Sequence, residues 1–381
     1  MIDHCRAILD FYEPVALDPR GGFFQNFLDD GEVFDKTSRH LVSSTRFIFN
    51  YAEAFRRGYG PHYSEWATHG INYLFKHHFA SQTSHFIWTV GGRSDKTAMA
   101  YGHAFVALAG ATAIRAGLEP GKSCLEAAVN ILERYFYEPK YKAYADERNA
   151  DLDQLSAYRG QNANMHICES LIASFHATQQ RHFLDRACTL AHQFAGNLAA
   201  LGGGMIWEHY TEVWEIDWEF NRDNPDDLFK PWGFQPGHQV EWAKLLTELY
   251  LITRDKWYLQ RAKCLFESAI NTGWDDEYGG LVYSIAPDGA FASADKYFWV
   301  QAEAIAAAYR LFKITCEAKY LDDYQRLWSY SWDHLIDHKH GGWFRLKTRT
   351  GQKIDNKKSP MGKVDYHTLG ACWDVLDQMV S

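Results

Sequence analysis

Apolar residues recur along the chain with the spacing of a helix that buries one face. Phe47, Tyr51, Ala54 and Phe55 lie at positions i, i+4, i+7 and i+8 of one stretch, and similar series follow further on. This spacing places the apolar side chains on one side of an α-helix. We therefore predict amphipathic helices of roughly 12 to 18 residues along much of the chain.

A short segment rich in glycine and aromatic residues separates the helical stretches. It is centred near residues 22, 87, 143, 205, 281 and 343, so it recurs six times at intervals of 56 to 76 residues. Each interval has room for two helices and a turn. The sequence therefore predicts an all-α fold, an (α/α)6 barrel of six helical hairpins in two concentric rings. The glycine-rich segments are expected as short extended pieces at one rim.

The chain is predicted to form one domain over residues 1–381, because no stretch rich in proline, serine or glycine divides it. The fourth interval is the longest, since it carries an acidic and aromatic insertion from His209 to Lys230. Two interpretations of this insertion stay open. It is a surface loop, or a loop that closes over a site on the rigid barrel.

Composition excludes several classes of protein. Hydrophobic residues make up 46% and charged residues 23% of the 381 positions, a globular balance, and the net charge of -9 without a basic stripe argues against nucleic-acid binding. No apolar run is long enough to span a membrane, and the first residues lack the pattern of a signal peptide. The 7 cysteines are scattered and never spaced as CxxC. We therefore expect free thiols and a cytoplasmic location.

Polar residues near the start of one helix in each repeat follow the same period as the glycine-rich segments. In a closed barrel, equivalent positions of six inner helices converge on one axis. Four of these six residues are histidines, which packing alone explains poorly because buried imidazoles need partners. We expect the set to face a common pocket, with His103 among its substrate-binding residues. The six are Arg46, His103, His166, His238, Gln301 and His367.

Carboxylates accompany two of these histidines. A proline and a glycine precede His238, so a helix begins there, and Glu241 follows three residues later on the same face. His166 and Glu169 repeat the spacing. A helix N-terminus disfavours imidazolium and keeps a neutral base available. The pattern predicts proton transfer near neutral pH, at a carbon beside a carbonyl or at hydroxyls.

Two other kinds of site use similar residues. His-x-x-Glu pairs on facing helices also ligate two metal ions, but Arg46 and Gln301 occupy two axial positions where further carboxylates belong. We therefore expect no metal and no cofactor. A glycosidase needs two opposed carboxylates, and this alternative stays open. The available acidic residues are Glu208, Glu212, Asp217 and Asp275.

Three segments together resemble the N-acylglucosamine 2-epimerase superfamily, whose members fold as (α/α)6 barrels. They are Tyr158 to His166, the stretch from Asn221 to Pro225 that leads into Pro236-Gly237-His238 and Glu241-Trp242, and Asp365 to His367. The resemblance covers nearly the whole chain. Within the superfamily these segments look most like the bacterial aldose–ketose isomerases.

The resemblance implies roles for particular residues. His238 and His367 are implied as the two acid/base residues. Residues implied to hold sugar hydroxyls are Arg46, Asn162, His166 and Glu241. Those implied to shape the pocket are Tyr101, Trp299 and Glu303.

The predicted reaction is the interconversion of an aldose and a ketose, D-mannose and D-fructose, through a cis-enediol. The partner is a small monosaccharide, without nucleic acid or membrane. A sugar 2-epimerase of the N-acylglucosamine or cellobiose type is the alternative, since those enzymes share the two histidines and the segment from Trp299 to Glu303 is similar to the cellobiose epimerase pattern. A non-catalytic sugar-binding protein is a further alternative. Two retained histidines argue against it, because binding alone does not need two bases.

Overall fold

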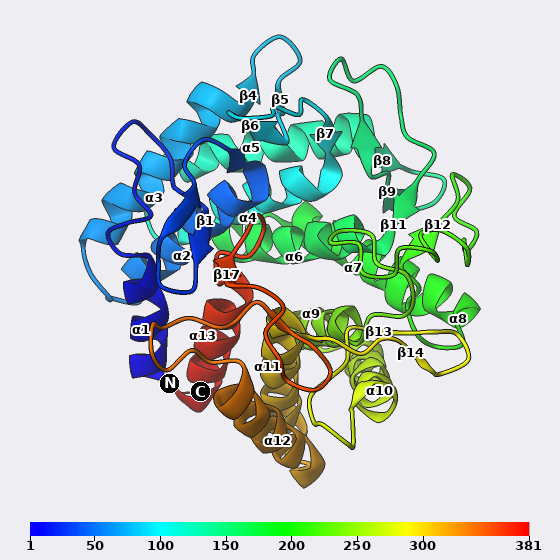
Figure 1. The fold of residues 1–381 in the computed structure, drawn as a ribbon. Helices are drawn as coiled ribbons and strands as arrows, with labels where there is room; N and C mark the ends of the chain where they lie inside the picture. The colour runs from blue at the N-terminus through cyan, green and yellow to red at the C-terminus, as the bar shows by residue number, and fades with distance from the viewer. Residues whose placement is uncertain (381) are drawn as a thin grey trace.

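The inner ring of the molecule consists of parallel helices around one axis. The computed structural model describes residues 1–380, and Ser381, the last residue of the predicted domain, lies outside the described residues. Each inner helix packs against the next along the chain, and the last packs against the first, so the ring is closed (Figure 1). Within residues 1–380 the six inner helices are α2 (Leu41–Arg56), α4 (Ala100–Arg115), α6 (Gln161–Thr178), α9 (Pro236–Thr253), α11 (Phe298–Thr315) and α13 (Tyr366–Val380).

An outer helix packs against each inner helix. Five of them follow their inner partner in the chain: α3 (His62–Tyr73), α5 (Gly121–Ile131), α7 (Arg181–Ala191), α10 (Lys256–Gly273) and α12 (Ala318–His334). The sixth is α1 (Ile2–Tyr12), which packs on α13, so the two ends of the described chain meet (Figure 1). Three outer helices continue into π-helical turns, η1 (Leu74–His78), η2 (Leu132–Phe136) and η3 (His192–Leu198), the last followed by α8 (Ala199–Leu201). The predicted (α/α)6 barrel is confirmed.

Small residues allow the helices of the two rings to approach closely. A Cβ atom added to Gly110 of α4 would lie 2.8 Å from the carbonyl oxygen of Gly121 in α5, where backbone leaves no room for it. Ala302, Ala306 and Ala371 form a buried cluster between α11 and α13. Outer helices bury one face only, as α12 does with Tyr320, Leu327 and Tyr330, and this is the amphipathic pattern of the sequence.

Short antiparallel strands lie in the connections that lead from an outer helix to the next inner helix, and hence at one end of the barrel. One sheet has three strands, in the order β17 (Lys357–Ser359), β1 (Asn26–Leu28), β2 (Val33–Asp35). The two-stranded sheets are β3 (Arg39–His40) with β6 (Thr89–Val90), β4 (Phe79–Ala80) with β5 (His85–Phe86), β7 (Ala98–Met99) with β10 (Glu147–Arg148), β8 (Tyr137–Glu138) with β9 (Ala143–Tyr144), β11 (Arg159–Gly160) with β12 (His209–Tyr210), β13 (Ser284–Ile285) with β14 (Phe291–Ser293), and β15 (Lys296–Tyr297) with β16 (Leu346–Lys347).

The glycine-rich segments turn sharply within these connections. Gly279 and Gly341 have φ of +73° and +84°, and Ser84 and Lys142 adopt the same left-handed conformation at the equivalent place in their repeats. Two residues after each turn an apolar residue forms a bridge back to the outer helix end, as Leu281 does to Trp274. The expectation of short extended segments at one rim is confirmed.

The fourth residue of an inner helix binds the backbone of the adjacent rim segment. The side-chain oxygen of Gln301 accepts from the N–H of Leu281 at 2.9 Å, and its amide nitrogen donates to the carbonyl of Leu281 at 2.7 Å. Gln239 binds Ile206 in the same way. Asn164 of α6 binds Tyr144, and His103 of α4 accepts from the N–H of Phe86. We call these four side chains the rim anchors.

We predict that Gln301→Leu destabilises the protein, because it leaves the buried N–H and C=O of Leu281 without partners. The free energy of unfolding is expected to fall by about 2 to 4 kcal/mol in urea titrations followed by circular dichroism. Gln82→Leu, at an exposed position, is the matched control and should change stability by less than about 0.5 kcal/mol. Equal stability of the two variants would contradict the anchoring role.

Candidate active site

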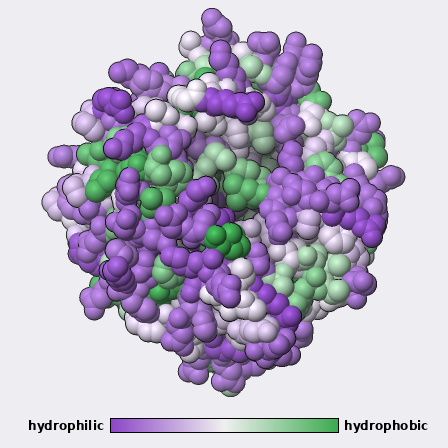
Figure 2. All heavy atoms as spheres, in the orientation of Figure 1, coloured by the Kyte–Doolittle hydropathy of each residue, from purple (hydrophilic) through white to green (hydrophobic). Residues whose placement is uncertain are grey.

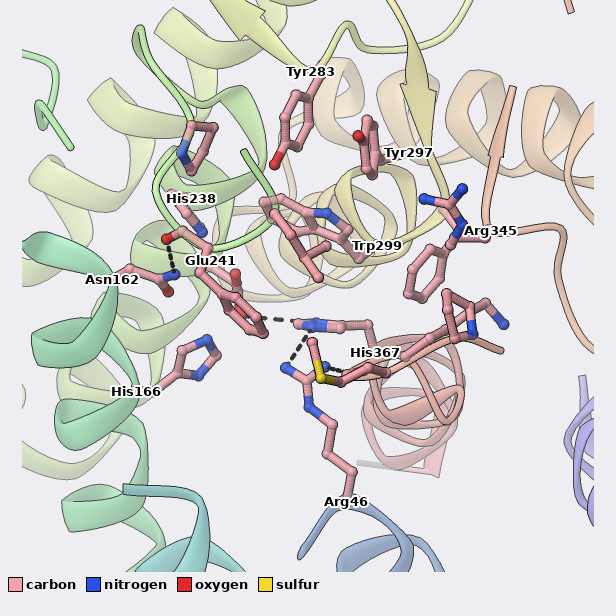
Figure 3. A pocket seen from close by; sticks show the side chains of 18 of the residues that line it. Arg46, Asn162, His166, His238, Glu241, Tyr283, Tyr297, Trp299, Arg345 and His367 are labelled. Carbon is pink, nitrogen blue, oxygen red and sulfur yellow. Dashed lines mark hydrogen bonds and ion pairs between the residues drawn. The ribbon is translucent and has the colours of Figure 1, made fainter. Parts of the chain in front are cut away.

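A pocket opens at the end of the barrel where the inner helices begin. It contains about 700 Å³ of free space, open solvent at its mouth included, which is within the range of small-ligand sites. Figure 2 shows this face as largely hydrophilic and hollowed near its centre. Eight of the predicted site residues line the pocket and come from all six inner helices (Figure 3). They are Arg46, Tyr101, Asn162, His166, His238, Glu241, Trp299 and His367.

Two positions of the inner helices supply most of these side chains. The second residue lines the pocket in α4, α6, α11 and α13, and the sixth does so in α2, α6 and α9. The two positions are four residues apart and therefore lie on one helix face. The second position provides Tyr101, Asn162, Trp299 and His367, and the sixth provides Arg46, His166 and Glu241.

His103 and Gln301 lie at the fourth position, and the structure places them outside this pocket as rim anchors. The Nε2 atom of His103 accepts from Phe86, and its Nδ1 lies 2.7 Å from the carbonyl oxygen of Met99. Both ring nitrogens are thus used by backbone, and burial lowers the pKa of His103 to about 4. The regular spacing of polar residues combined helix positions with different roles, since its six members occupy the second, third, fourth or sixth position of their helices. A histidine in this place holds the rim instead of facing the axis.

His238 is held by a buried carboxylate that the sequence did not pair with it. Its Nδ1 lies 2.9 Å from both oxygens of Glu208. Gln161 donates its amide to the same carboxylate, and the indole N–H of Trp242 donates to Gln161. Since a carboxylate accepts, Nδ1 of His238 carries the proton and Nε2 is left as an acceptor.

A positional signal for Glu208 exists in the sequence. Glu208 comes two residues after Ile206, the residue held by a rim anchor. Tyr283 and Arg345, which line the pocket, come two residues after Leu281 and Trp343. In these three repeats the position two residues beyond the apolar residue of the rim segment supplies a side chain of the pocket or a partner of its histidine. The position is recognised only when the residue held by the helix is known.

His367 is held by Glu303, which lies beneath the pocket wall. Its Nδ1 is 2.7 Å from Oε1 of Glu303, and its Nε2 is 3.2 Å from a guanidinium nitrogen of Arg46, which donates to it. Burial lowers the pKa of His367 to about 4; the bond to Glu303 opposes this shift and the charge of Arg46 reinforces it. Lys244 and His367 lower the pKa of Glu303 to about 2, against the effect of burial. The ring is therefore neutral, with its proton on Nδ1.

His166 forms a third pair of this kind. Its Nδ1 lies 2.9 Å from Glu169, three residues later, as the spacing predicts, and the hydroxyl of Tyr366 donates to the other oxygen of Glu169. Burial lowers the pKa of His166. The rings of His166 and His367 are 6.5 Å apart. The pocket thus contains three imidazoles whose Nδ1 atoms all face carboxylates.

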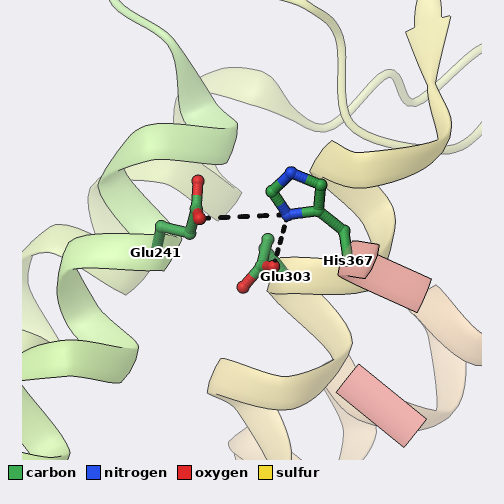
Figure 4. Close-up of side chains that lie close together, drawn as sticks. All are labelled: Glu241, Glu303 and His367. Carbon is green, nitrogen blue, oxygen red and sulfur yellow. Dashed lines mark hydrogen bonds and ion pairs between the residues drawn. The ribbon is translucent and has the colours of Figure 1, made fainter. Parts of the chain in front are cut away.

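Glu241 does not pair with His238, although the spacing suggested that they share a face. It lies 3.9 Å from Nδ1 of His367, beside Glu303 (Figure 4). Burial and the charge of Glu303 raise the pKa of Glu241 well above its ordinary value. Among the described residues, Oε2 of Glu241 has no hydrogen-bond partner, and the same holds for Oδ1 of Asn162. Both atoms belong to the pocket wall and are available to a ligand.

The insertion His209 to Lys230 covers the pocket. Leu228 and Phe229, followed by Pro231, line it from above, and the ring of Phe229 packs at 5.6 Å and 6.0 Å from Trp88 and Tyr101 on the opposite wall. The segment 360–363 lines the other side. Of the two interpretations left open by the sequence, the structure supports the loop that closes over the site.

Glu241, Glu303 and His367 place one ligand atom each within 4.8 Å of one another, the kind of cluster that can hold a metal ion. Two cations already occupy its surroundings. Lys244 binds Glu303, and Arg46 donates to His367. A divalent ion would have to displace these contacts against their charge. Asp275, a candidate carboxylate of a glycosidase, is instead paired with Lys296 and Arg349.

Comparison with known proteins places this arrangement in a family. The family model for N-acylglucosamine 2-epimerase matches residues 22–371. A D-mannose isomerase from Marinomonas mediterranea is 48% identical over 376 residues, covering 98% of this chain and 95% of that protein. The crystal structure of a D-mannose isomerase matches with a TM-score of 0.96 and 47% identity, covering 99% and 97% of the two chains. A cellobiose 2-epimerase from Spirochaeta thermophila shares the fold, with a TM-score of 0.87, 22% identity, and coverage of 99% and 94%.

The chain belongs to the N-acylglucosamine 2-epimerase family. The resemblance predicted from its three segments is confirmed, and the nearly full-length likeness to D-mannose isomerases agrees with the predicted branch.

We predict that His367 stays neutral from pH 8 down to about pH 5, because its pKa is about 4. Its neutral form is lost only as the pH falls through that value. An NMR titration of histidine-labelled protein, with His367→Asn to assign the signal, measures the midpoint. A midpoint near 6.5 would show that burial and Arg46 do not act on this ring as described.

Proposed function

We propose that the protein is an aldose–ketose isomerase that interconverts D-mannose and D-fructose. The observation that carries the proposal is the pair His238 and His367, each with Nδ1–H bound to a buried carboxylate and Nε2 unprotonated. In His367 this Nε2 accepts a hydrogen bond from Arg46. The ring of Trp299 lies near both histidines, with ring centroids 5.0 Å from His238 and 5.8 Å from His367. The likeness to D-mannose isomerases supports the choice of substrate.

The first step is opening of the pyranose ring. One histidine takes the proton of the O1 hydroxyl and delivers it to O5, so that the C1–O5 bond breaks and the open aldehyde forms. Glu241 and Asn162 line the pocket, each with a side-chain oxygen that has no partner among the described residues, and they hold sugar hydroxyls during this step. The covering loop excludes water from the open-chain sugar.

The second step moves a proton from C2 to C1. A neutral imidazole removes the C2 proton, and the electron pair of that bond forms the C1–C2 double bond of a cis-enediolate as the C1=O double bond opens onto its oxygen. Arg46 donates to this oxygen, on which negative charge develops. The proton of the O2 hydroxyl passes to O1, which gives the cis-enediol form with its charge on O2. The same imidazole then returns its proton to C1 on the same face while the C2=O2 carbonyl forms, and the ketose results.

A 2-epimerase is the alternative reaction of the same pocket. It would return a proton to C2 from the opposite face with the second histidine. Two D-mannose isomerase likenesses near half identity favour isomerisation, whereas the cellobiose 2-epimerase likeness at 22% identity concerns the fold. A sugar-binding protein without catalysis would not need carboxylate-held bases.

The proposed reaction uses the chain's own residues and needs no metal or cofactor, because Arg46 supplies the positive charge beside the developing oxyanion. We place the reaction in the cytoplasm. All seven cysteines are free, which agrees with a reducing compartment. Within residues 1–380, no helix is both long enough and apolar enough to cross a membrane.

The experiment that tests the proposal is an NMR time course with D-mannose in D2O and EDTA. D-fructose should appear, with partial deuterium at C1, because a proton held by an imidazole exchanges with solvent. Glucose with deuterium at C2 and little fructose would identify a 2-epimerase instead. Loss of activity in EDTA, restored by added metal, would contradict metal-free chemistry.

His238→Ala and His367→Ala should each lower kcat by about 10²- to 10⁴-fold, the contribution of a positioned acid or base. Steady-state assays with D-mannose give kcat, and circular dichroism checks the fold. His182→Ala removes an exposed histidine and is the control, expected to match the wild type. Activity within about tenfold of wild type in both pocket variants would refute the assignment.

A further inference from the structure

A second cavity opens at the other end of the barrel, where the inner helices end. It contains about 1280 Å³ of free space, open solvent included, and its wall reaches inward to Glu169, Glu303 and Tyr366. Two of these, Glu169 and Glu303, hold the pocket histidines His166 and His367. One layer of side chains therefore separates the sugar pocket from a charged cavity behind it.

Most cations of this rear cavity are paired with carboxylates of the same cavity. Arg56 and Arg57 bind Glu53, and Arg310 binds Glu248 and Asp374. These ion pairs join the ends of the inner helices. Within residues 1–380, these arginines and their carboxylate partners form no hydrogen bond with the histidines of the sugar pocket.

Lys244 differs from these cations in what it binds. It comes from α9, its side chain is 17% exposed, and its ammonium donates to Glu303, whose other oxygen accepts from His367. Its charge therefore acts on the far side of the carboxylate that holds a pocket base. Lys244 does not line the sugar pocket.

We propose that Lys244 is a positioning residue that acts through Glu303 to keep the proton of His367 on Nδ1 and its Nε2 unprotonated. This inference rests on the proposed function. Lys244 keeps Glu303 ionised, Glu303 then accepts from Nδ1, and Nε2 is left to face the substrate.

The crowding of carboxyl groups explains why an ammonium is needed here. His367 is faced by Glu303 from α11, Glu241 from α9, Arg46 from α2 and His166 from α6. Two carboxyl groups this close hold one proton between them. Lys244 directs that proton to Glu241. Without the ammonium, Glu303 competes for the proton and donates to Nδ1 when protonated. The ring proton then moves to Nε2, which gives up its hydrogen bond from Arg46 and no longer acts as a base.

The other catalytic pair shows the contrast. Glu208 beside His238 is held by the neutral amide of Gln161, and within residues 1–380 no second carboxylate faces His238 in an ion pair. A neutral donor is sufficient there. The two histidines are thus fixed in the same tautomer by different means, one with an amide and one with a buried ammonium.

The test compares Lys244→Met with Lys244→Arg. Lys244→Met should lower kcat for D-mannose by about 10- to 100-fold, the range seen when the partner of a functional histidine is removed, with KM changed less than about threefold because Lys244 does not touch the pocket. The acidic limb of the kcat profile should move to higher pH, since Glu303 takes up a proton more readily. Lys244→Arg should restore most of kcat and the original profile.

Two controls separate this role from a general effect on structure. Arg56→Met removes a cation of the same cavity that does not bind Glu303, and should change kcat by less than about twofold. In a Glu303→Gln background, Lys244→Met should have little further effect, since both act through one carboxylate. The double variant also avoids an unpaired buried charge, so it keeps the test available if Lys244→Met does not fold. An undiminished kcat in Lys244→Met, or an equal loss in the Glu303→Gln background, would overturn the proposal.

A readout independent of activity distinguishes failure of this proposal from failure of the proposed function. The ring ¹⁵N shifts of His367 should report an Nδ1–H tautomer in the wild type and a proton on Nε2 in Lys244→Met. Unchanged shifts would overturn the role of Lys244 even if the wild type isomerises D-mannose. A wild type inactive on D-mannose would refute the proposed function, while the shifts still decide the role of Lys244.

Discussion

The arrangement of the pocket depends on hydrogen bonds between the inner helices and the backbone of the rim. Gln239 and Gln301 each bind both polar groups of one buried residue, so the rim segment is fixed in register with the start of the helix. Satisfying buried backbone groups is obligatory, and a side-chain amide matches a donor and an acceptor together. Once this register is set, Glu208 and Tyr283, two places beyond the anchored Ile206 and Leu281, are brought to the pocket and its histidine. Glu208 meets His238 for this reason.

Much of the fold follows from local patterns in the sequence. Helical spacing and the sixfold glycine-rich segment predict the hairpins, because each hairpin is a local unit that needs its neighbours to bury its face. The sequence does not show that α1 is the outer partner of α13, since this contact joins distant parts of the chain. It is a tertiary contact with no local signal.

The sequence predicts which helices contribute residues to the candidate site, but less well which residue of each helix faces the pocket. Arg46 and His166 occupy the sixth position of their helices, whereas His103 occupies the fourth, and a start uncertain by two residues does not separate these positions. Glu241 follows His238 by three residues on the same helix, yet packing turns it to His367. The partner of each imidazole is decided by contacts between repeats, which spacing within one repeat does not contain.

The ring of helices is closed where the two ends of the described chain meet, and this is where local unfolding is expected to begin. Five of the helix pairs consist of helices that follow one another in the chain. The sixth pair, α1 with α13, joins its two ends through contacts such as the bond from the Tyr12 hydroxyl to Asp365, 353 residues away. We call the contacts of α13 with α1 and α2 the seam of the ring. Local hairpins form readily, whereas distant contacts carry the entropy of a long closure. This seam runs through the sugar pocket, where Arg46 and Asn50 of α2 bind His367 and the carbonyl of Val364. A fluctuation that separates α2 from α13 therefore disrupts the pocket while the other hairpins stay folded. The time for which the pocket stays intact is then set by the rate of this local opening.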